Sequence, residues 1–552
     1  MSLYDKASLV LIPSGTKAGK VYSQKPTSGD GDFDFTRSSY ATRVNSQGLI
    51  EKERSNLVLQ SNSFDTTWST PAGGISTPTS GQTGYDGTSD AWLLSKTASG
   101  HSRLIQTISS SGLQTFSLYA KEGTLKMVRL LGLGGGNPEA HFNLNTGNID
   151  VVDSDVIASN MQSVGGGWYR CSISFDDTIT EVRIYPLEAQ GDTTTLGNIY
   201  IQDAQLEQGI VATDVIETTT SAVYEGITDN VPRLDYDGDC PSLLLEPQRT
   251  NEIPNTEEMT GVSMSSSTFQ YNQGISPDGT NNAIKVTRGT NDVVMRFRNV
   301  VETSKTYTFS IYVKTISGTK NVSVDITDDN VTYFTATTTW QRISTTVTVT
   351  RTPQSEYHFA DFTLVGSTQG DSILIYAPQV EEGSYATSYI PTYGTSVTRT
   401  GDLCNNAGDS TIFNDEEGVL YAEIAALSND GTDRVIEIRN STNSQEYLNI
   451  RIDQTDNRFQ MVVRAQGANS TTRGINVNNA LEFNKIAIRY KQGESFRIFA
   501  NGNKEDDTGS AGNPTPSGLD QLLTQGNFIG KIKSILYFDR ALTDTELADL
   551  TS

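Results

Sequence analysis

The chain has 552 residues, with 41 basic and 65 acidic side chains and a formal net charge of −24. This length predicts several domains, because a single hydrophobic core stops growing at about 250–300 residues. Charged residues make up 19% and hydrophobic residues 35%, which favours loop-rich β domains over a helical enzyme. The acidic balance argues against nucleic acid as a partner, since phosphate backbones would be repelled.

Neither a membrane span nor a secretory signal is predicted. The apolar run LVLIP at 9–13 is too short for a signal peptide, and no stretch reaches the roughly 20 apolar residues of a membrane helix. Three widely spaced cysteines, Cys171, Cys240 and Cys404, predict reduced thiols rather than a disulfide framework or a zinc site. We therefore expect a protein assembled in the cytoplasm, without membrane insertion.

Residues 1–54 are predicted to form an N-terminal anchoring and adaptor segment. Its phrase ATRVNSQGLIEKERSNL (41–57) resembles VPRLDYDGDCPSLLLEPQRTNEI (231–253), and we interpret each as a β-hairpin adaptor. The aligned charged residues are Arg43 with Arg233, Glu51 with Glu246, and Arg54 with Arg249. We expect these charges to form ion pairs that fix each adaptor, with a functional role as the alternative.

Residues 55–224 and 250–400 are predicted to be two copies of one jelly-roll domain, separated by an adaptor hairpin at 225–249. TFSLYAK at 115–121 returns as TFSIYVK at 308–314. Both phrases alternate apolar and polar side chains, as strands with one buried face do. Short antiparallel strands separated by Gly, Asn, Asp and Ser clusters predict a β-sandwich or jelly roll.

The closing phrase is repeated as well: IQDAQLEQG at 201–209 returns as IYAPQVEEG at 375–383. Matching phrases lie 192–195 residues apart early in the copies but 172–174 apart later. The first copy therefore holds about 20 extra residues, which we place at 131–155. The Gly-rich stretch LGLGGGNPEA (131–140) falls there and is expected to be a surface loop, since it lacks the Lys-Ser/Thr of a phosphate loop.

Residues 401–552 are predicted to form another all-β module. Its strands are followed by a short predicted helix, within FDRALTDTELADL at 538–550. Thr543 is the expected N-cap, and Glu546 three residues later completes a capping box.

The turn phrase DGT occurs in both copies, at 86–88 and 278–280. Asp86 and Asp278 are candidate ligands for a structural calcium ion, because calcium prefers carboxylate and backbone oxygens. The alternative is an ordinary tight turn, which Asp-Gly pairs favour. Asp90 is a possible further ligand and Asp203 a weaker one, since its position in the second copy holds Ala377.

The four tryptophans are candidates for stacking on sugar rings. Trp168 and Trp340 stand at equivalent positions before a strand and are expected to lie in the core, as is Trp92. Trp68 has no equivalent in the second copy and is expected to be exposed, so it is the candidate ligand-binding residue.

No catalytic residue and no cofactor is predicted. The histidines His101, His141 and His358 are not near a Gly-x-Ser-x-Gly elbow. Glu423 has no paired carboxylate at the right alternation, and hydrolysis of a glycosidic bond needs two.

The phrases of the chain resemble known families. The two copies, with DGT, FSxYxK, a Trp before a late strand and QxExG, resemble carbohydrate-binding-module jelly rolls. The run from EEGVLYAEI to GKIKSILYFDRALTDTELADL resembles the concanavalin A-like (laminin-G-like) lectin/glucanase fold. FDFTRSSYATRVNSQGLIE and YATSYIPTYGTSVTRT resemble segments of tailed-bacteriophage structural proteins.

This resemblance implies a virion protein: a tail fibre, spike, or head fibre or decoration protein that binds host cell-surface glycans. It also implies other virion proteins as partners and homo-oligomers, with a trimer plausible. Two alternatives remain open, namely a purely architectural protein that binds no sugar and a glycan depolymerase. The glucanase pattern E-x-D-x-x-E is missing from residues 401–552, which argues against the enzyme.

Overall fold

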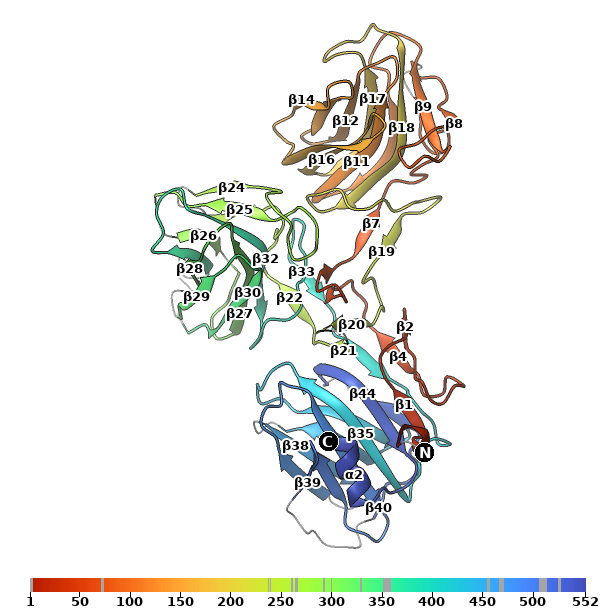
Figure 1. Cartoon of the computed structure of the whole chain (residues 1–552), viewed down its shortest axis with the longest axis vertical. Coiled ribbons are helices and arrows are strands. Elements are labelled where there is room, and N and C mark those ends of the chain that lie inside the picture. The colour runs from red at the N-terminus through yellow and green to blue at the C-terminus, as the bar shows by residue number, and fades with distance from the viewer. Residues whose placement is uncertain are drawn as a thin grey trace.

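The computed structural model describes the chain from residue 3 to residue 552, apart from 71–73, 237, 239, 260–261, 264–266, 291–292, 299, 328–329, 351–358, 454–456, 466–470, 506–513 and 525–527. About 50% of the structure is strand and 2% is helix. The prediction of an all-β chain of sandwich domains is therefore confirmed. Figure 1 shows three lobes: the first sandwich at the top, the second at the left and the C-terminal sandwich at the bottom.

The first sandwich consists of two antiparallel sheets. One sheet has the order β15 (Ala158–Gly165), β16 (Trp168–Asp176), β11 (Leu113–Glu122), β18 (Gly197–Gln208), β9 (Ala91–Lys96), β8 (Thr79–Gln82). The other has the order β10 (Leu104–Ser110), β17 (Ile179–Leu187), β12 (Met127–Gly134), β13 (Glu139–Asn143), β14 (Asn148–Val152). Alternate residues such as Phe116, Leu118 and Phe175 are fully buried between the sheets, as the period of two predicts.

The second sandwich repeats this order. Its sheets run β24 (Thr268–Gln270), β25 (Ile284–Thr287), β32 (Ser372–Glu382), β27 (Thr306–Thr315), β30 (Gln341–Thr348), and β23 (Val262–Ser263), β26 (Val293–Arg298), β31 (Phe359–Val365), β28 (Lys320–Ile326), β29 (Thr332–Ala336). Strand β27 takes the place of β11, and β32 that of β18. Among the described residues, β14 and β15 have no counterpart strand in the second copy, and β23 has none in the first. The extra residues of the first copy therefore supply β14 and β15, one in each sheet.

The Gly-rich stretch 131–140 is not the surface loop that the sequence predicted. Its first four residues belong to β12 and its last two to β13, with a turn between. Leu131 is 4% exposed and Ala140 is fully buried. Gly132 lies against the ring of Phe175, where a Cβ would come within 3.0 Å, so this glycine lets two layers approach closely.

Each of the two sandwiches stands on a two-stranded stalk made from its incoming and outgoing strands. In the first, β7 (Arg54–Asn56) pairs with β19 (Val223–Glu225); in the second, β22 (Arg249–Asn251) pairs with β33 (Val397–Arg399). Both stalks are antiparallel. The chain therefore leaves each sandwich beside the point where it arrived.

The repeated closing phrase forms a buried hydrogen-bond network beside each stalk. In the first copy, Glu207 accepts hydrogen bonds from Gln205 Nε2 at 2.6 Å and from Thr213 N at 2.9 Å. In the second, Glu381 accepts from Gln379 Nε2 at 2.7 Å and from the Thr387 amide at 2.8 Å. The phrase QxExG therefore recurs because each outgoing linker is tied to the last strand in the same way.

The C-terminal sandwich has a large sheet with the order β20 (Arg233–Tyr236), β21 (Pro241–Leu245), β44 (Gly530–Phe538), β35 (Glu417–Ala426), β40 (Asn484–Lys491), β41 (Arg497–Ala500), β42 (Asn503–Lys504), and β1 (Leu9–Leu11) also pairs with β44. The facing sheet has the order β39 (Thr471–Asn476), β38 (Arg458–Arg464), β37 (Asn443–Ile452), β36 (Arg434–Asn440), β43 (Gln521–Leu523). The two sheets share one core. The concanavalin A-like assignment stays a prediction.

This sandwich is completed by residues from far upstream, which the sequence did not predict. The second adaptor supplies β20 and β21, and the N-terminal segment supplies β1. A further sheet joins β2 (Thr16–Lys17), β3 (Lys20–Val21) and β4 (Phe33–Thr36) to β34 (Leu403–Asn405), and β5 (Arg43–Val44) pairs with β6 (Ile50–Glu51). Both chain termini therefore lie on the bottom lobe (Figure 1). The predicted domain limits themselves stay a prediction.

Two short helices lie near the termini, α1 (Leu3–Lys6) and α2 (Asp544–Thr551). Thr543 caps α2 and forms the predicted capping box with Glu546. In the described part of the chain, neither helix is long and apolar enough to cross a membrane. The three cysteines are free thiols, as predicted.

Candidate ligand-binding cleft

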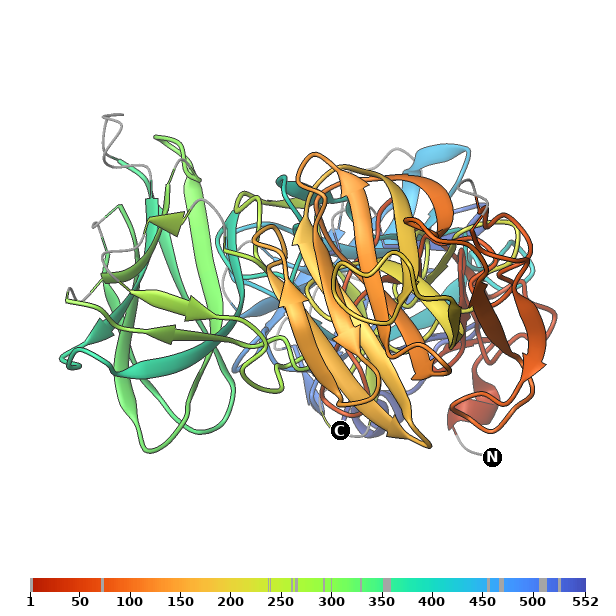
Figure 2. The same cartoon turned by 90° about the horizontal axis from the view of Figure 1, so that it is seen from above.

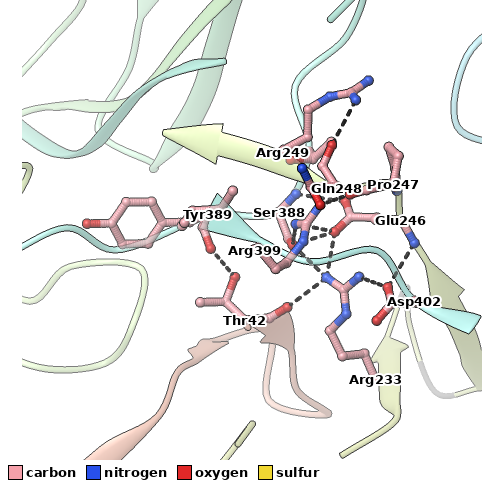
Figure 3. Close-up of polar contacts among 12 residues, drawn as sticks. Thr42, Arg233, Glu246, Pro247, Gln248, Arg249, Ser388, Tyr389, Arg399 and Asp402 are labelled. Atoms are coloured by element: carbon pink, nitrogen blue, oxygen red, sulfur yellow. Dashed lines mark hydrogen bonds and ion pairs between the residues drawn. The ribbon is translucent and has the colours of Figure 1, made fainter. Parts of the chain in front are cut away.

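The second adaptor and the second stalk meet in a cluster of buried charges, which we call the junction: Arg37, Arg233, Glu246, Arg399 and Asp402. Figure 3 shows the last four of these residues. Glu246 Oε2 lies 2.5 Å from Arg233 Nη1 and 2.6 Å from Arg399 Nη1. Arg233 also pairs with Asp402, which lies 3.2 Å from Arg37 Nη1. The predicted Arg233–Glu246 ion pair is confirmed.

The junction keeps its carboxylates ionised. Burial alone would raise the pKa of Glu246, but Arg399 and Arg233 outweigh burial and hold that pKa well below its usual range. Ser388 Oγ donates a further hydrogen bond to Glu246 at 2.6 Å. The network joins the N-terminal segment, the adaptor and the stalk, so it fixes the second sandwich on the C-terminal one.

In the first adaptor the aligned pair is also formed. Arg43 Nη2 lies 2.7 Å from Glu51 Oε2, but both side chains are partly exposed. Arg54 pairs with Glu225 across the first stalk at 3.3 Å. Arg249, at the equivalent position of the second stalk, lies 3.8 Å from Glu381. The charges of both adaptors therefore form the expected structural ion pairs.

Both DGT phrases form tight turns. Asp86 Oδ1 accepts hydrogen bonds from Thr88 N at 3.0 Å and Thr88 Oγ1 at 2.6 Å. Asp278 Oδ1 accepts from Thr280 N at 2.9 Å and Thr280 Oγ1 at 2.7 Å. In the part of the chain that the structure describes, no group of three or more His, Cys, Asp or Glu side chains could hold a metal ion. Calcium binding stays a prediction.

Asp278 already has a cation beside it. Lys52 of the first adaptor reaches into the second sandwich, where its Nζ lies 2.6 Å from Glu257 Oε1 and 3.2 Å from Asp278 Oδ2. Burial alone would raise the pKa of Asp278, but Lys52 and hydrogen bonds from Thr280 hold it well below the usual value. A calcium ion at this turn would have to displace the Lys52 ammonium group.

A cleft of about 1280 Å³ lies between the first sandwich, the first adaptor and the second sandwich. Its walls are the outer face of β15 and β16, the linker at 210–214, the β5–β6 hairpin, and the loops at 270–273 and 278–281. Figure 1 shows the red adaptor between the two sandwiches, and Figure 2 shows the first sandwich offset from the second. The Lys52–Asp278 pair lies in the floor of this cleft.

Uncharged hydrogen-bonding side chains dominate the cleft. Its amide side chains are those of Asn45, Gln47, Asn160, Gln162, Gln270, Asn272, Gln273 and Asn281. Asn160 and Gln162 point from β15 to the same side as Ser172 and Arg170 of β16, with which they are paired in the sheet. An amide can both donate and accept, as a sugar hydroxyl does, so this lining suits a polyhydroxylated ligand.

The charges in the cleft are largely paired. Lys52 and Asp278 form one pair and Arg54 and Glu225 another. Arg170 lies over the ring of Tyr119 at 5.3 Å and donates to Ser117 Oγ at 3.3 Å. The cleft as a whole therefore favours a neutral ligand over a polyanion.

The tryptophans lie elsewhere. Trp68 is only 6% exposed, packs against Phe64 at 5.3 Å between ring centroids, and donates to Gln60 O at 3.2 Å. The expectation that Trp68 is exposed is therefore wrong: its ring completes the core and leaves no face for a sugar. Trp92 and Trp168 are buried as predicted.

Trp340 is only partly buried, unlike its counterpart Trp168, so the expectation that Trp340 lies in the core is wrong. Its indole donates to Ile275 O at 2.9 Å. His141 is buried beside Glu139 at 3.3 Å, and His101 is exposed. His358 lies outside the described residues.

The comparisons with known proteins add few constraints. No family model and no curated protein matches the chain, whereas 53 chains of solved structures match parts of it. The CBM40 of the Ruminococcus gnavus IT-sialidase, bound to α2,3 sialyllactose, is 19% identical, with 26% of this chain and 91% of that chain covered at a TM-score of 0.22. The CBM22-1–CBM22-2 tandem domain of Paenibacillus barcinonensis Xyn10C is 10% identical, with 60% and 97% covered, also at 0.22.

A third match is the receptor binding domain of botulinum neurotoxin type G, 13% identical, with 27% of this chain and 41% of that chain covered at a TM-score of 0.21. TM-scores of this size establish no common fold for the chain as a whole. The cleft must therefore be judged on its own residues.

Sequence reasoning missed the residues that build the cleft. Asn160 and Gln162 belong to β15, which the first copy alone carries, so no repeat pointed to them. Lys52 stands where the second adaptor has Pro247, and this difference between the adaptors was the one available signal. Which loop Lys52 would reach depends on the arrangement of whole domains, and no local pattern encodes that.

Proposed function

We propose that this chain is a glycan-binding protein whose inter-sandwich cleft holds an oligosaccharide, without cleaving it. The observation that carries the proposal is the amide lining of the cleft. Asn160, Gln162 and Gln270 make no side-chain hydrogen bond with other described residues, so their donors and acceptors are available to a ligand.

The size of the cleft supports a ligand of several sugar rings. Pockets for single drug-sized ligands hold about 300–1,000 Å³, and this cleft of about 1280 Å³ exceeds that range. Its walls come from two domains and an adaptor held by the Lys52 ion pairs. A pre-formed cleft loses less conformational entropy on binding than a mobile one would.

We further propose that the chain is a structural protein of a phage particle, as its adaptor phrases suggest, and that it attaches to host-surface glycans. Many copies on one particle would raise the effective affinity of a weak cleft.

The test is a glycan array probed with the full chain on a multivalent support, compared with the double variant Asn160→Ala/Gln162→Ala. Asn148→Ala, an exposed amide on β14 outside the cleft, is the matched control. We expect binding to at least one neutral glycan class, a loss of tenfold or more in the double variant, and no loss in the control.

Binding that the double variant retains would refute the cleft as the site. Binding to no glycan class at multivalent density would refute glycan binding and leave the architectural alternative. Release of reducing ends from host polysaccharide would support the depolymerase alternative instead.

A further inference from the structure

The first and second sandwiches touch each other directly beside the cleft. Leu113 N, at the start of β11, donates to Tyr393 O at 3.2 Å. Gly112 permits this approach, because a Cβ on it would lie 2.2 Å from the same oxygen. Asn272 Nδ2 donates to Ile210 O at 3.4 Å, and both of these residues line the cleft. This inter-sandwich contact therefore sets the distance between two walls of the cleft.

Two carboxyl groups face each other in the inter-sandwich contact. Asp176 ends β16 and lies opposite Leu113 in the sheet of the first sandwich. Its side chain is within hydrogen-bonding reach of Glu258, which lies in the loop after the second stalk. Glu258 is 6% exposed, whereas Asp176 is open to solvent. Asn255 Nδ2 donates to Glu258 Oε2 at 2.7 Å, which leaves Oε1 for Asp176.

This pair of carboxyl groups needs a proton to stay together. Burial and the charge of Asp176 raise the pKa of Glu258 to about 7. In the described part of the chain, neither group has a cation as an ion-pair partner. Two carboxyl groups at one site share a single proton, because two negative charges so close together repel. Glu258 is the buried member, so it holds the proton and donates a hydrogen bond to Asp176.

The other ionisable groups around Glu258 keep their charge near neutral pH. Glu257, the next residue in the same loop, is paired with Lys52 at 2.6 Å. Tyr271 OH donates to Glu258 O at 2.5 Å, and burial and the charge of Glu258 raise the pKa of Tyr271 to about 12. Burial also raises the pKa of Tyr393 well above its ordinary value. Both hydroxyls therefore stay neutral, and the Asp176–Glu258 pair is the group that changes charge.

We propose that Asp176 and Glu258 form a proton-dependent latch, which holds the first sandwich against the second and so keeps the cleft at its binding width. Without the proton the two charges repel, and the first sandwich turns away on its two-stranded β7–β19 stalk. Because the pKa of Glu258 is raised from 4.5 to about 7, the latch is fully closed below about pH 4.5 and opens as the pH rises through about 7. Its control over ligand binding rests on the proposed glycan function, whereas the latch itself does not.

The test measures hydrogen exchange at the Leu113 amide of the full chain from pH 5.5 to pH 8.5, as a protection factor corrected for the intrinsic rate. This amide is hydrogen-bonded across the contact, so its protection reports opening of the latch. We expect protection to fall at least tenfold over this range, and at most tenfold per pH unit because one proton is lost. The Phe116 amide, in the middle of β11, should keep its protection throughout.

Two variants should remove the pH dependence. Glu258→Gln keeps a hydrogen-bond donor toward Asp176 at every pH, and Asp176→Asn removes one of the two charges, so Leu113 protection should stay constant in both. Asp192→Asn is the matched control, because Asp192 is an aspartate in the loop between β17 and β18, at the other end of β17 from Asp176. It should retain the wild-type profile. Thermal unfolding of each variant confirms that the fold is intact.

Constant Leu113 protection in the wild type, or a wild-type decline in Glu258→Gln, would overturn the latch. The second arm repeats the glycan array at pH 6 and pH 8, where we expect wild-type binding to be at least threefold weaker at pH 8 and that of Glu258→Gln to be equal at both. Equal wild-type binding at the two pH values, beside falling Leu113 protection, would overturn control of the cleft by the latch. Binding at neither pH would refute the glycan function, while the exchange profile would still decide the latch.

Discussion

At the scale of single residues, Lys52 has the largest effect on the arrangement of the domains. It brings a positive charge from the first adaptor to two carboxylates of the second sandwich, Glu257 and Asp278, which are 3% and 2% exposed. A buried charge that loses its partner is costly because water cannot replace the lost interaction. The lysine therefore both closes the floor of the cleft and stabilises the second sandwich.

The variant Lys52→Met tests this role. We expect the free energy of unfolding of the second sandwich to fall by about 3–5 kcal/mol, the range for breaking a buried ion pair. Urea denaturation, monitored by hydrogen exchange at the Thr280 amide, measures this free energy of unfolding. Lys126→Met removes a lysine from the exposed pair with Glu188 and should have little effect. Equal losses in the two variants would contradict the account.

The pH dependence of stability follows from the same carboxylates. The pKa of Asp278 and that of Glu246 are held below their unfolded values, so protonation favours the unfolded chain. We expect the contribution of these groups to be fully present above about pH 5 and to be lost progressively as the pH falls through and below about 4. Asp278→Asn should flatten this decline in a series of urea denaturations from pH 6 to pH 3. A decline as steep as that of the wild type would contradict the assignment.

At the scale of elements, a buried asparagine in the incoming strand of each stalk holds the outgoing linker of that sandwich. Asn251 Nδ2 donates to Ile390 O at 2.9 Å, and its Oδ1 accepts from Val380 N and Ile253 N, both at 3.2 Å. Asn56 makes the equivalent contacts in the first copy, including a bond to Ile216 O at 2.8 Å. One asparagine thus satisfies three backbone groups that water does not reach.

Asn251→Ala should loosen only the second sandwich. Unpaired buried backbone groups cost about 1–3 kcal/mol each, so we expect a loss of at least that size. Hydrogen exchange should show faster exchange at Val380 and Ile253, with the first copy unchanged. Asn56→Ala should give the mirror-image result. Faster exchange in both sandwiches after a single substitution would contradict the claim that each asparagine holds only the linker of its own sandwich.

Much of the element order could be predicted from the repeat. The alternation in 115–121 and 308–314 identified the central strands, and the charged residues of the adaptors identified their ion pairs. The extra strands β14 and β15 could not be placed in a sheet, because pairing at a sheet edge depends on contacts far along the chain. The prediction that Trp68 is exposed was wrong because a tryptophan without a repeat partner can still fill a core.

At the scale of the whole molecule, the chain is a C-terminal base that carries two sandwiches on stalks. Strand β1 (residues 9–11) and the second adaptor (strands at 233–236 and 241–245) complete the large sheet of the base, so these two upstream segments fold as one unit with the C-terminal module. Leu9, Val10 and Leu11 are fully buried there. The β1–β44 register, with Val10 opposite Leu536, joins the two ends of the chain.

Leu11→Ala should therefore destabilise the C-terminal base, although Leu11 and its partner strand β44 are more than 400 residues apart in sequence. We expect a loss of about 2–5 kcal/mol, the range for a buried leucine truncated to alanine. Hydrogen exchange at Ile535, its partner in β44, reports the effect. Ile12→Ala is the matched control, because Ile12 is 37% exposed. Protection of β44 that is unchanged in Leu11→Ala would show that β1 does not belong to the base.

The most direct test of the central claim is a crystal structure of the full chain with the oligosaccharide that binds best on the array. The account predicts sugar rings between β15 and the loop at 270–273, with hydroxyls hydrogen-bonded to Asn160, Gln162 and Gln270. Sugar bound on the C-terminal sandwich, or on another face of either jelly roll, with the cleft empty, would contradict it.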